Sequence, residues 1–109
     1  MNTENLNLLA KIAACVCGKD GVISQLEEEC IYNTILSQNP SYSLAQFNKA
    51  IDDFFDETFQ LEDYLAKVSE IGCKEFILHL CEVSASADGL DIKENIALNK
   101  VKLILDESL

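Results

Sequence analysis

The chain has 109 residues, of which 49% are apolar, so it can fold as one domain with its own core rather than remain disordered. Its formal net charge is −11, and its basic residues comprise eight lysines and no arginine. Because arginine is the usual side chain that contacts phosphates and base edges, we expect no direct binding to nucleic acid or to an anionic membrane surface. No apolar run approaches the roughly 20 residues that cross a bilayer.

The N-terminal stretch carries Glu4 and lacks the basic region of a secretory signal, so we expect a cytoplasmic protein with reduced thiols. The five cysteines are odd in number and do not have the spacing of a disulfide framework. We interpret them as small buried hydrophobic residues, with a metal–thiolate cluster as the alternative. They stand at positions 15, 17, 30, 73 and 81.

The first half of the chain reads as helix. Apolar residues recur every three or four positions over residues 5–18, which predicts one helix that ends at a glycine. Ser24 then forms a predicted capping box with Glu27, and the helix that follows stops near residue 38, before Pro40.

The rest of the chain continues in the same way. A second capping box, Ser43 with Gln46, opens a helix whose apolar stripe continues to Thr58. A third box, Asp91 with Glu94, opens the last helix. The segments predicted to be helical after the third helix are residues 61–71, 74–87 and 92–106.

No segment shows the alternation typical of a strand, and no linker is visible. We therefore predict a single all-α domain over residues 1–109, a compact bundle of about six helices. One sequence pattern, Asp-Gly followed by a capping residue and Glu, occurs twice, as CGKDGVISQLEEE at 17–29 and as ASADGLDIKE at 85–94. We call it the repeated phrase. Each copy follows a helix rich in small residues and precedes another helix, so the bundle is predicted to consist of two related helix hairpins with a helical middle insert.

The acids of the repeated phrase have two interpretations. As turn chemistry, Asp20 and Asp88 are turn residues beside glycine, and the glutamates that follow complete capping boxes. Alternatively, hairpins packed about a pseudo-twofold axis would bring Asp20 and Asp88 together with Glu27 or Glu28 and Glu94. Carboxylates gathered around one point repel unless a cation lies among them, and hard oxygen ligands favour Ca²⁺ or Mg²⁺.

The two phrases resemble the tellurite-resistance TerB family and the related N-terminal domain of membrane-anchored DnaJ-type co-chaperones. The resemblance implies an all-α fold with two related halves, an acidic site with which a metal associates, and an accessory role in a bacterial stress-response system. This chain departs from the pattern at Lys19, where alanine is usual, and its second loop is one residue shorter. The candidate cation ligands are Asp20, Glu27, Glu28, Asp88, Asp91 and Glu94.

The middle of the chain is aromatic and acidic. Phe54, Phe55 and Phe59 are core residues by default, but phenylalanine left exposed there would mark a groove for a protein partner. We interpret the acidic pairs at 52–53, 56–57 and 62–63 as solvated helix faces rather than catalytic carboxylates.

No catalytic signature is present. The chain has no Glu-x-x-His pair, no nucleophile elbow, no phosphate loop and no dinucleotide fingerprint, so we expect it not to be an enzyme. The resemblance implies a non-enzymatic interaction module of a stress-response or defence system, with a protein as its partner. The strong negative charge motivates an alternative, an acidic immunity or inhibitor protein that neutralises a basic toxin or nuclease.

Overall fold

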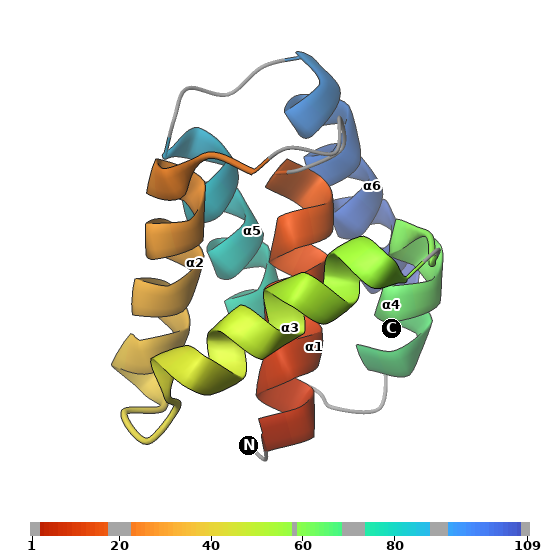
Figure 1. Ribbon diagram of the computed structural model, residues 1–109. Coiled ribbons are helices and arrows are strands. Elements are labelled where there is room, and N and C mark those ends of the chain that lie inside the picture. The colour runs from red at the N-terminus through yellow and green to blue at the C-terminus, as the bar shows by residue number, and fades with distance from the viewer. Residues whose placement is uncertain (1–2, 18–22, 58, 69–73, 88–91, 108–109) are drawn as a thin grey trace.

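The structure is a computed structural model that describes residues 3–17, 23–57, 59–68, 74–87 and 92–107, without the side chains of 68, 92–94 and 105–107. Within these ranges all regular secondary structure is α-helical, which confirms the predicted all-α fold (Figure 1). The helices of the described ranges are α1 (Thr3–Cys17), α2 (Gln25–Gln38), α3 (Leu44–Asp56), α4 (Leu61–Val68), α5 (Lys74–Ser86) and α6 (Ile92–Glu107).

The first helix, α1, is the centre of the bundle and contacts each of the other five (Figure 1). More than half of its residues are buried, and they form a broad face rather than a narrow stripe. An apolar face of this width requires several neighbouring elements to cover it. Three of the fully buried residues are Ala10, Ala13 and Ala14, whose small side chains allow the neighbouring helices to approach closely.

The bundle consists of two terminal hairpins, α1 with α2 and α5 with α6, and an inserted pair, α3 and α4. Helix α2 packs against α1, and α6 packs against α5, while α5 contacts both α1 and α2. The inserted helices α3 and α4 also pack on α1, and α4 contacts α6. Figure 1 shows α3 crossing α1 obliquely, so that its C-terminal end reaches α4. This arrangement agrees with the two hairpins and the helical insert predicted from the sequence.

Two of the three predicted capping boxes are formed. Ser24 Oγ accepts from the Glu27 amide at 3.1 Å, and Glu27 Oε1 accepts from the Ser24 amide at 2.9 Å. Ser43 and Gln46 make the equivalent pair of hydrogen bonds, both at 3.1 Å. The third box lies outside the described residues at Asp91. These bonds satisfy amides at the starts of α2 and α3 that have no partner within the helix.

The start of α3 is held by two tyrosines. The Tyr42 hydroxyl donates to Asn7 Oδ1 on α1 at 2.8 Å, and the Tyr32 hydroxyl donates to the Tyr42 carbonyl at 3.2 Å. Burial, together with the nearby Tyr32, raises the pKa of Tyr42 to about 12. The neutral phenol therefore remains a hydrogen-bond donor that ties the connection between α2 and α3 to the central helix.

Helix α3 ends at Asp56, two residues before the end that its apolar stripe predicts. Glu57 is extended, with φ −84° and ψ 150°, and its amide still donates to the carbonyls of Asp53 and Phe54. At this point the Glu57 side chain bonds to two other helices, as described below. None of the described helices is both long and apolar enough to span a membrane.

Candidate partner-binding surface

Four aromatic side chains meet where α3 ends and α4 begins, and we call this cluster the aromatic corner. Phe54 lies 5.3 Å from Phe55 and 6.2 Å from Tyr64, measured between ring centroids, and Phe59 lies 5.8 Å from Tyr64. These separations are within the range of favourable aromatic pairs. The aromatic corner is therefore one continuous cluster that joins α3, the connection after it and α4.

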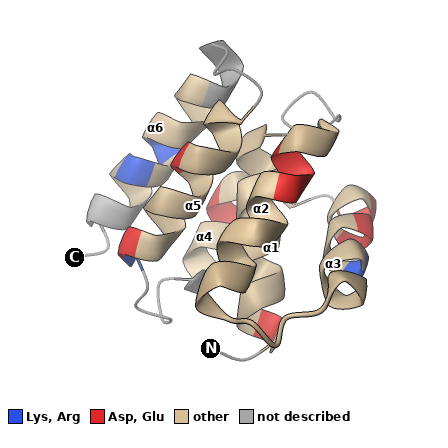
Figure 2. Ribbon diagram, turned by 90° about the vertical axis from the view of Figure 1, so that its left-hand side faces the viewer, with Lys and Arg blue, Asp and Glu red and all other residues tan. Residues whose placement is uncertain are grey.

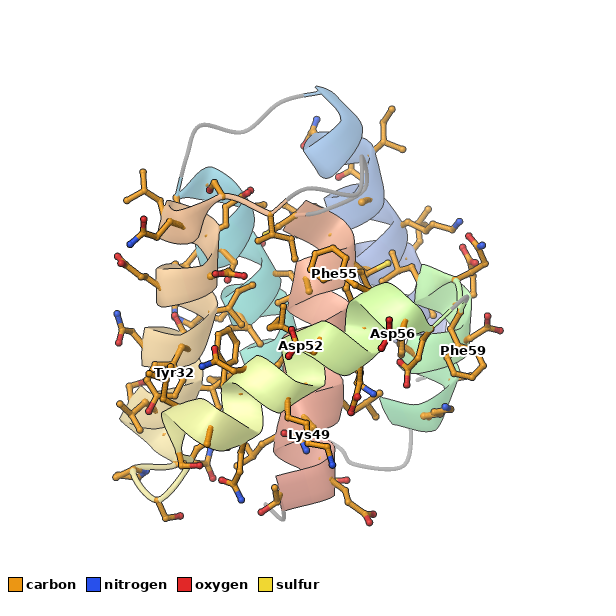
Figure 3. All side chains as sticks on the ribbon, viewed as in Figure 1. Tyr32, Lys49, Asp52, Phe55, Asp56 and Phe59 are labelled. Atoms are coloured by element: carbon orange, nitrogen blue, oxygen red, sulfur yellow. The ribbon has the colours of Figure 1, made fainter. Side chains whose placement is uncertain are left out.

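The members of the aromatic corner differ in exposure. Tyr64 is buried at 1% exposure, and Phe54 is partly buried against the core. Phe55 and Phe59 are 48% and 47% exposed, so each ring presents about half of its surface to solvent (Figure 3). The structure thus brings together the three phenylalanines predicted from the sequence. Phe54 packs against the core, and Phe55 and Phe59 lie at the surface.

A pocket of about 260 Å³ opens beside the aromatic corner. It lies among α1, α6 and the connection between α3 and α4, with Phe54, Phe59, Leu61 and Ala97 as its apolar lining. Binding sites for small molecules usually have volumes of about 300–1,000 Å³. The pocket therefore lies just below the small end of that range. Its polar lining comes from Cys15, Glu57, Gln60, Glu62 and Lys100.

Glu57 fastens the aromatic corner to the bundle. Lys11 Nζ of α1 donates to Glu57 Oε2 at 2.9 Å, and the Tyr64 hydroxyl of α4 donates to Glu57 Oε1 at 2.8 Å. Burial favours a higher pKa for Glu57, but the hydrogen bonds and charge contributed by Lys11 and Tyr64 outweigh it and lower the pKa overall. Burial, followed by the bond to Glu57, raises the pKa of Tyr64. An ionised carboxylate therefore bridges a lysine and a neutral phenol.

This bridge corrects part of the interpretation of the acidic pairs. Glu57 is only partly exposed and is hydrogen-bonded through both carboxylate oxygens, so it does not belong to a solvated helix face. Glu62 is also engaged, in a salt bridge with Lys100 of α6. Sequence reasoning missed Lys11 because it lies 46 positions from Glu57, and no local pattern links the two residues.

Unlike Glu57 and Glu62, the aspartates of α3 agree with the prediction of a solvated acidic helix face. Asp52 and Asp56 are exposed and Asp53 is partly exposed, and no salt bridge in the described part of the chain involves any of the three. Figure 2 shows acidic positions on α2 and α3 and lysine positions on α6. In Figure 3, Asp52, Phe55 and Asp56 lie on neighbouring parts of α3, and Phe59 follows beyond the end of the helix.

The predicted cation ligands are described only in part. Glu27 is buried at 5% exposure and uses Oε1 in its capping box, while Glu28 is partly exposed. Asp20, Asp88 and Asp91 lie outside the described residues, as does the side chain of Glu94. The described part of the chain contains no group of three or more His, Cys, Asp or Glu side chains that could hold a metal ion. The cation site stays a prediction.

Four of the cysteines lie in the described ranges, and none of these four is in a disulfide. Cys17 and Cys81 are buried, and Cys15 and Cys30 are partly buried, in agreement with their interpretation as small hydrophobic residues. Cys73 lies outside the described residues. Burial, followed by the nearby Cys15, raises the pKa of Cys81 to about 12 and keeps this thiol neutral.

No family model matches the chain, and no curated protein or solved structure matches it significantly. The resemblance to the TerB family therefore rests on the repeated Asp-Gly phrase alone. What the protein does must be argued from the surface that the structure describes, and the aromatic corner with its pocket is the most distinctive part of that surface.

Proposed function

We propose that this protein is a non-enzymatic interaction module that binds a partner protein through the aromatic corner. The observation that carries the proposal is the pair of half-exposed rings, Phe55 and Phe59, beside an open pocket. Large aromatic side chains bury about 150–250 Å² each, so half of each ring offers about 100 Å². At about 25 cal/mol per Å², each ring would contribute about 2.5 kcal/mol when a partner covers it.

The scaffold supports a binding role rather than acid–base chemistry. Glu57, which lines the pocket, has both carboxylate oxygens hydrogen-bonded within the protein. That arrangement uses Glu57 to hold the aromatic corner in place, which is a structural role. A preformed aromatic surface also limits the conformational entropy that binding would cost.

The resemblance to the TerB family adds the biological setting of the proposal. It suggests an accessory module in a bacterial stress-response or defence system, located in the cytoplasm. A second candidate function, an acidic inhibitor of a basic toxin or nuclease, is favoured by the net charge of −11 and by the α3 aspartates, which form no salt bridge with another described residue. The identity of the captured partner distinguishes the two, because a toxin or nuclease would lose its activity in a stoichiometric complex.

The binding proposal is tested with matched surface variants. Phe55→Ser with Phe59→Ser removes the exposed rings of the aromatic corner. Ile96→Ser with Leu103→Ser is the control, because these α6 residues are 55% and 63% exposed and lie outside the aromatic corner and its pocket. Each protein is used to capture partners from a lysate of the source organism, and each identified partner is then purified and titrated by calorimetry.

The phenylalanine variant loses both rings, so we expect it to bind the purified partner at least about a thousandfold more weakly, which is about 4 kcal/mol, and the α6 variant to bind like the wild type. Circular dichroism establishes that both variants remain folded. Equal binding by wild type and phenylalanine variant, or loss of binding only in the α6 variant, would refute the role of the aromatic corner.

The cation site is a separate part of the proposal. EDTA-stripped protein is titrated with Ca²⁺, Mg²⁺ and Mn²⁺ by calorimetry, and its melting temperature is measured with each ion. A saturable site that raises the melting temperature, and that disappears in Asp20→Ala with Asp88→Ala, supports a cation at the repeated phrase. Absence of binding by all three ions leaves the acids as turn and capping residues.

A further inference from the structure

We infer that the partner of the aromatic corner presents an arginine or lysine next to an apolar side chain, with the apolar residue in the pocket and the basic residue on the C-terminal end of α3. This inference rests on the proposed function and names the chemistry of the partner. Three features of the corner carry it: the charges at the end of α3, the exposed ring faces, and the neutralised acids of the pocket.

The C-terminal end of α3 has an unfavourable arrangement of charge. Its last turn contains Asp53 and Asp56 and no basic residue, and Asp52 lies immediately before it. The end of a helix carries a partial negative charge, so it favours cations and disfavours carboxylates. Glu57 adds one more acid beyond the helix, but Lys11 neutralises it. The three aspartates have no salt bridge in the part of the chain that the structure describes.

Local rules of this kind are commonly broken where a surface serves a function. A cation from a partner would interact with the exposed aspartates and with the negative end of the helix at the same time. Lys49 of α3, about one turn before these aspartates, does not supply that cation, since no salt bridge among the described residues includes it.

The ring faces of the aromatic corner can hold a cation. Lys67 Nζ already lies over the Phe59 ring, 4.5 Å from its centroid. Such contacts are attractive because the face of an aromatic ring is electron-rich. Phe55 is equally exposed, and Asp52 and Asp56 lie beside it on α3 (Figure 3). A guanidinium or ammonium group over Phe55 would meet both the ring and the neighbouring carboxylates.

The pocket is the proposed site for the apolar side chain that lies next to the partner's basic residue. Its two acids are already compensated, Glu57 by Lys11 and Glu62 by Lys100. An extra basic group inside the pocket would therefore meet neutralised carboxylates. Outside, on α3, it would meet aspartates that form no salt bridge within the described ranges. Phe54, Phe59, Leu61 and Ala97 give this pocket of about 260 Å³ an apolar wall against which an apolar side chain can pack. A second copy of this chain is a poorer occupant, because two molecules of charge −11 repel each other.

The test uses synthetic peptides with blocked ends and equal length as probes. One carries leucine and arginine, a second carries leucine and glutamate, and a third carries serine and arginine. Binding is measured by fluorescence anisotropy for the wild type and for two variants with the same change in net charge. Asp52→Asn with Asp56→Asn alters the end of α3, and Glu29→Gln with Glu75→Gln alters exposed acids of α2 and α5.

We expect the leucine–arginine peptide to bind the α3 variant about tenfold more weakly than the wild type, with the control within about twofold of the wild type. The leucine–glutamate and serine–arginine peptides should bind weakly to all three proteins. The α3 variant should also melt at a higher temperature than the wild type, because it removes carboxylates from the negative end of a helix. Weaker binding by a more stable protein cannot come from unfolding.

Equal weakening in the control variant, or equal binding of the glutamate peptide, would overturn the inference, because the attraction would then be unspecific. Self-association that is lost in Phe55→Ser with Phe59→Ser would overturn it in favour of a second copy. For a purified natural partner, dependence on the phenylalanines but not on Asp52 and Asp56 would overturn this inference while leaving the proposed function intact. Binding that depends neither on the phenylalanines nor on the aspartates would overturn both this inference and the proposed function.

Discussion

Substitution of Glu57 by alanine is the most informative perturbation of the described structure. Glu57 joins three segments, because it accepts from Lys11 of α1 at 2.9 Å and from Tyr64 of α4 at 2.8 Å while it follows the end of α3. Without its carboxylate, the hydroxyl of the 1% exposed Tyr64 loses its acceptor, and the 16% exposed Lys11 side chain loses its counter-ion.

The expected cost follows from these two losses. Leaving a buried hydroxyl without a partner costs about 1–3 kcal/mol. The lysine loss is smaller, about 1 kcal/mol, since the pair is only partly buried and the long lysine stem can carry the ammonium group into water. We therefore expect Glu57→Ala to lower the free energy of unfolding by about 3 kcal/mol. At about 4 °C per kcal/mol for a domain of this size, the melting temperature should fall by about 12 °C.

Urea and thermal unfolding followed by circular dichroism measure the effect. Tyr64→Phe is the matched control, because it removes the hydroxyl and keeps the ring, at a cost of about 1 kcal/mol. The double variant should cost less than the sum of the single ones, because both remove the same hydrogen bond. A Glu57→Ala protein within about 0.5 kcal/mol of the wild type would refute the view that Glu57 holds the aromatic corner.

The same residue predicts a pH dependence. Because the folded protein lowers the pKa of Glu57 below its ordinary value of 4.5, ionised Glu57 stabilises the folded state. This contribution is fully present above pH 4.5 and is lost as the pH falls through the lower folded value. The difference in stability between wild type and Glu57→Ala should therefore shrink below pH 4.5 and stay constant from pH 5 to 7. A difference that grows on acidification would contradict the assignment.

Three further variants test the interior and the helix ends by urea unfolding. Ser43→Ala should cost about 1 kcal/mol by removing the cap of α3, and restoration by Ser43→Asp would separate this loss from a packing effect. Ser84 is fully buried and its hydroxyl has no partner within the described residues, so Ser84→Ala should stabilise the protein by about 1 kcal/mol, whereas Ser86→Ala on the exposed side of α5 should be neutral. Burial raises the pKa of Cys81 from 9.0 to about 12, so stability should fall by up to about 1.4 kcal/mol as the pH rises from 9.0 to 10.0, below the range in which Tyr42 and Tyr64 titrate. Cys81→Ala should lack this loss.

The helices could be predicted because their signals are local. Ser24 and Ser43 each bond a residue only three positions away, and apolar periodicity is read within one or two turns. The predicted segments therefore match the observed helices closely, and the all-α bundle follows from them. For the candidate surface, the sequence predicted which phenylalanines are involved but not which of them are exposed. Phenylalanine in the middle of the chain can lie in the core or at the surface.

The sequence by itself determined the helices, their caps and the acidic character of the chain, because these depend on neighbours along the chain. Only the tertiary structure decided that Phe54 packs against the core while Phe55 is half-exposed, although the two are adjacent in the sequence. It also decided that Glu57 leaves the helix to bind Lys11, 46 positions away. Exposure and long-range pairing depend on which helices pack together, and that choice is made by the whole core rather than by any one segment.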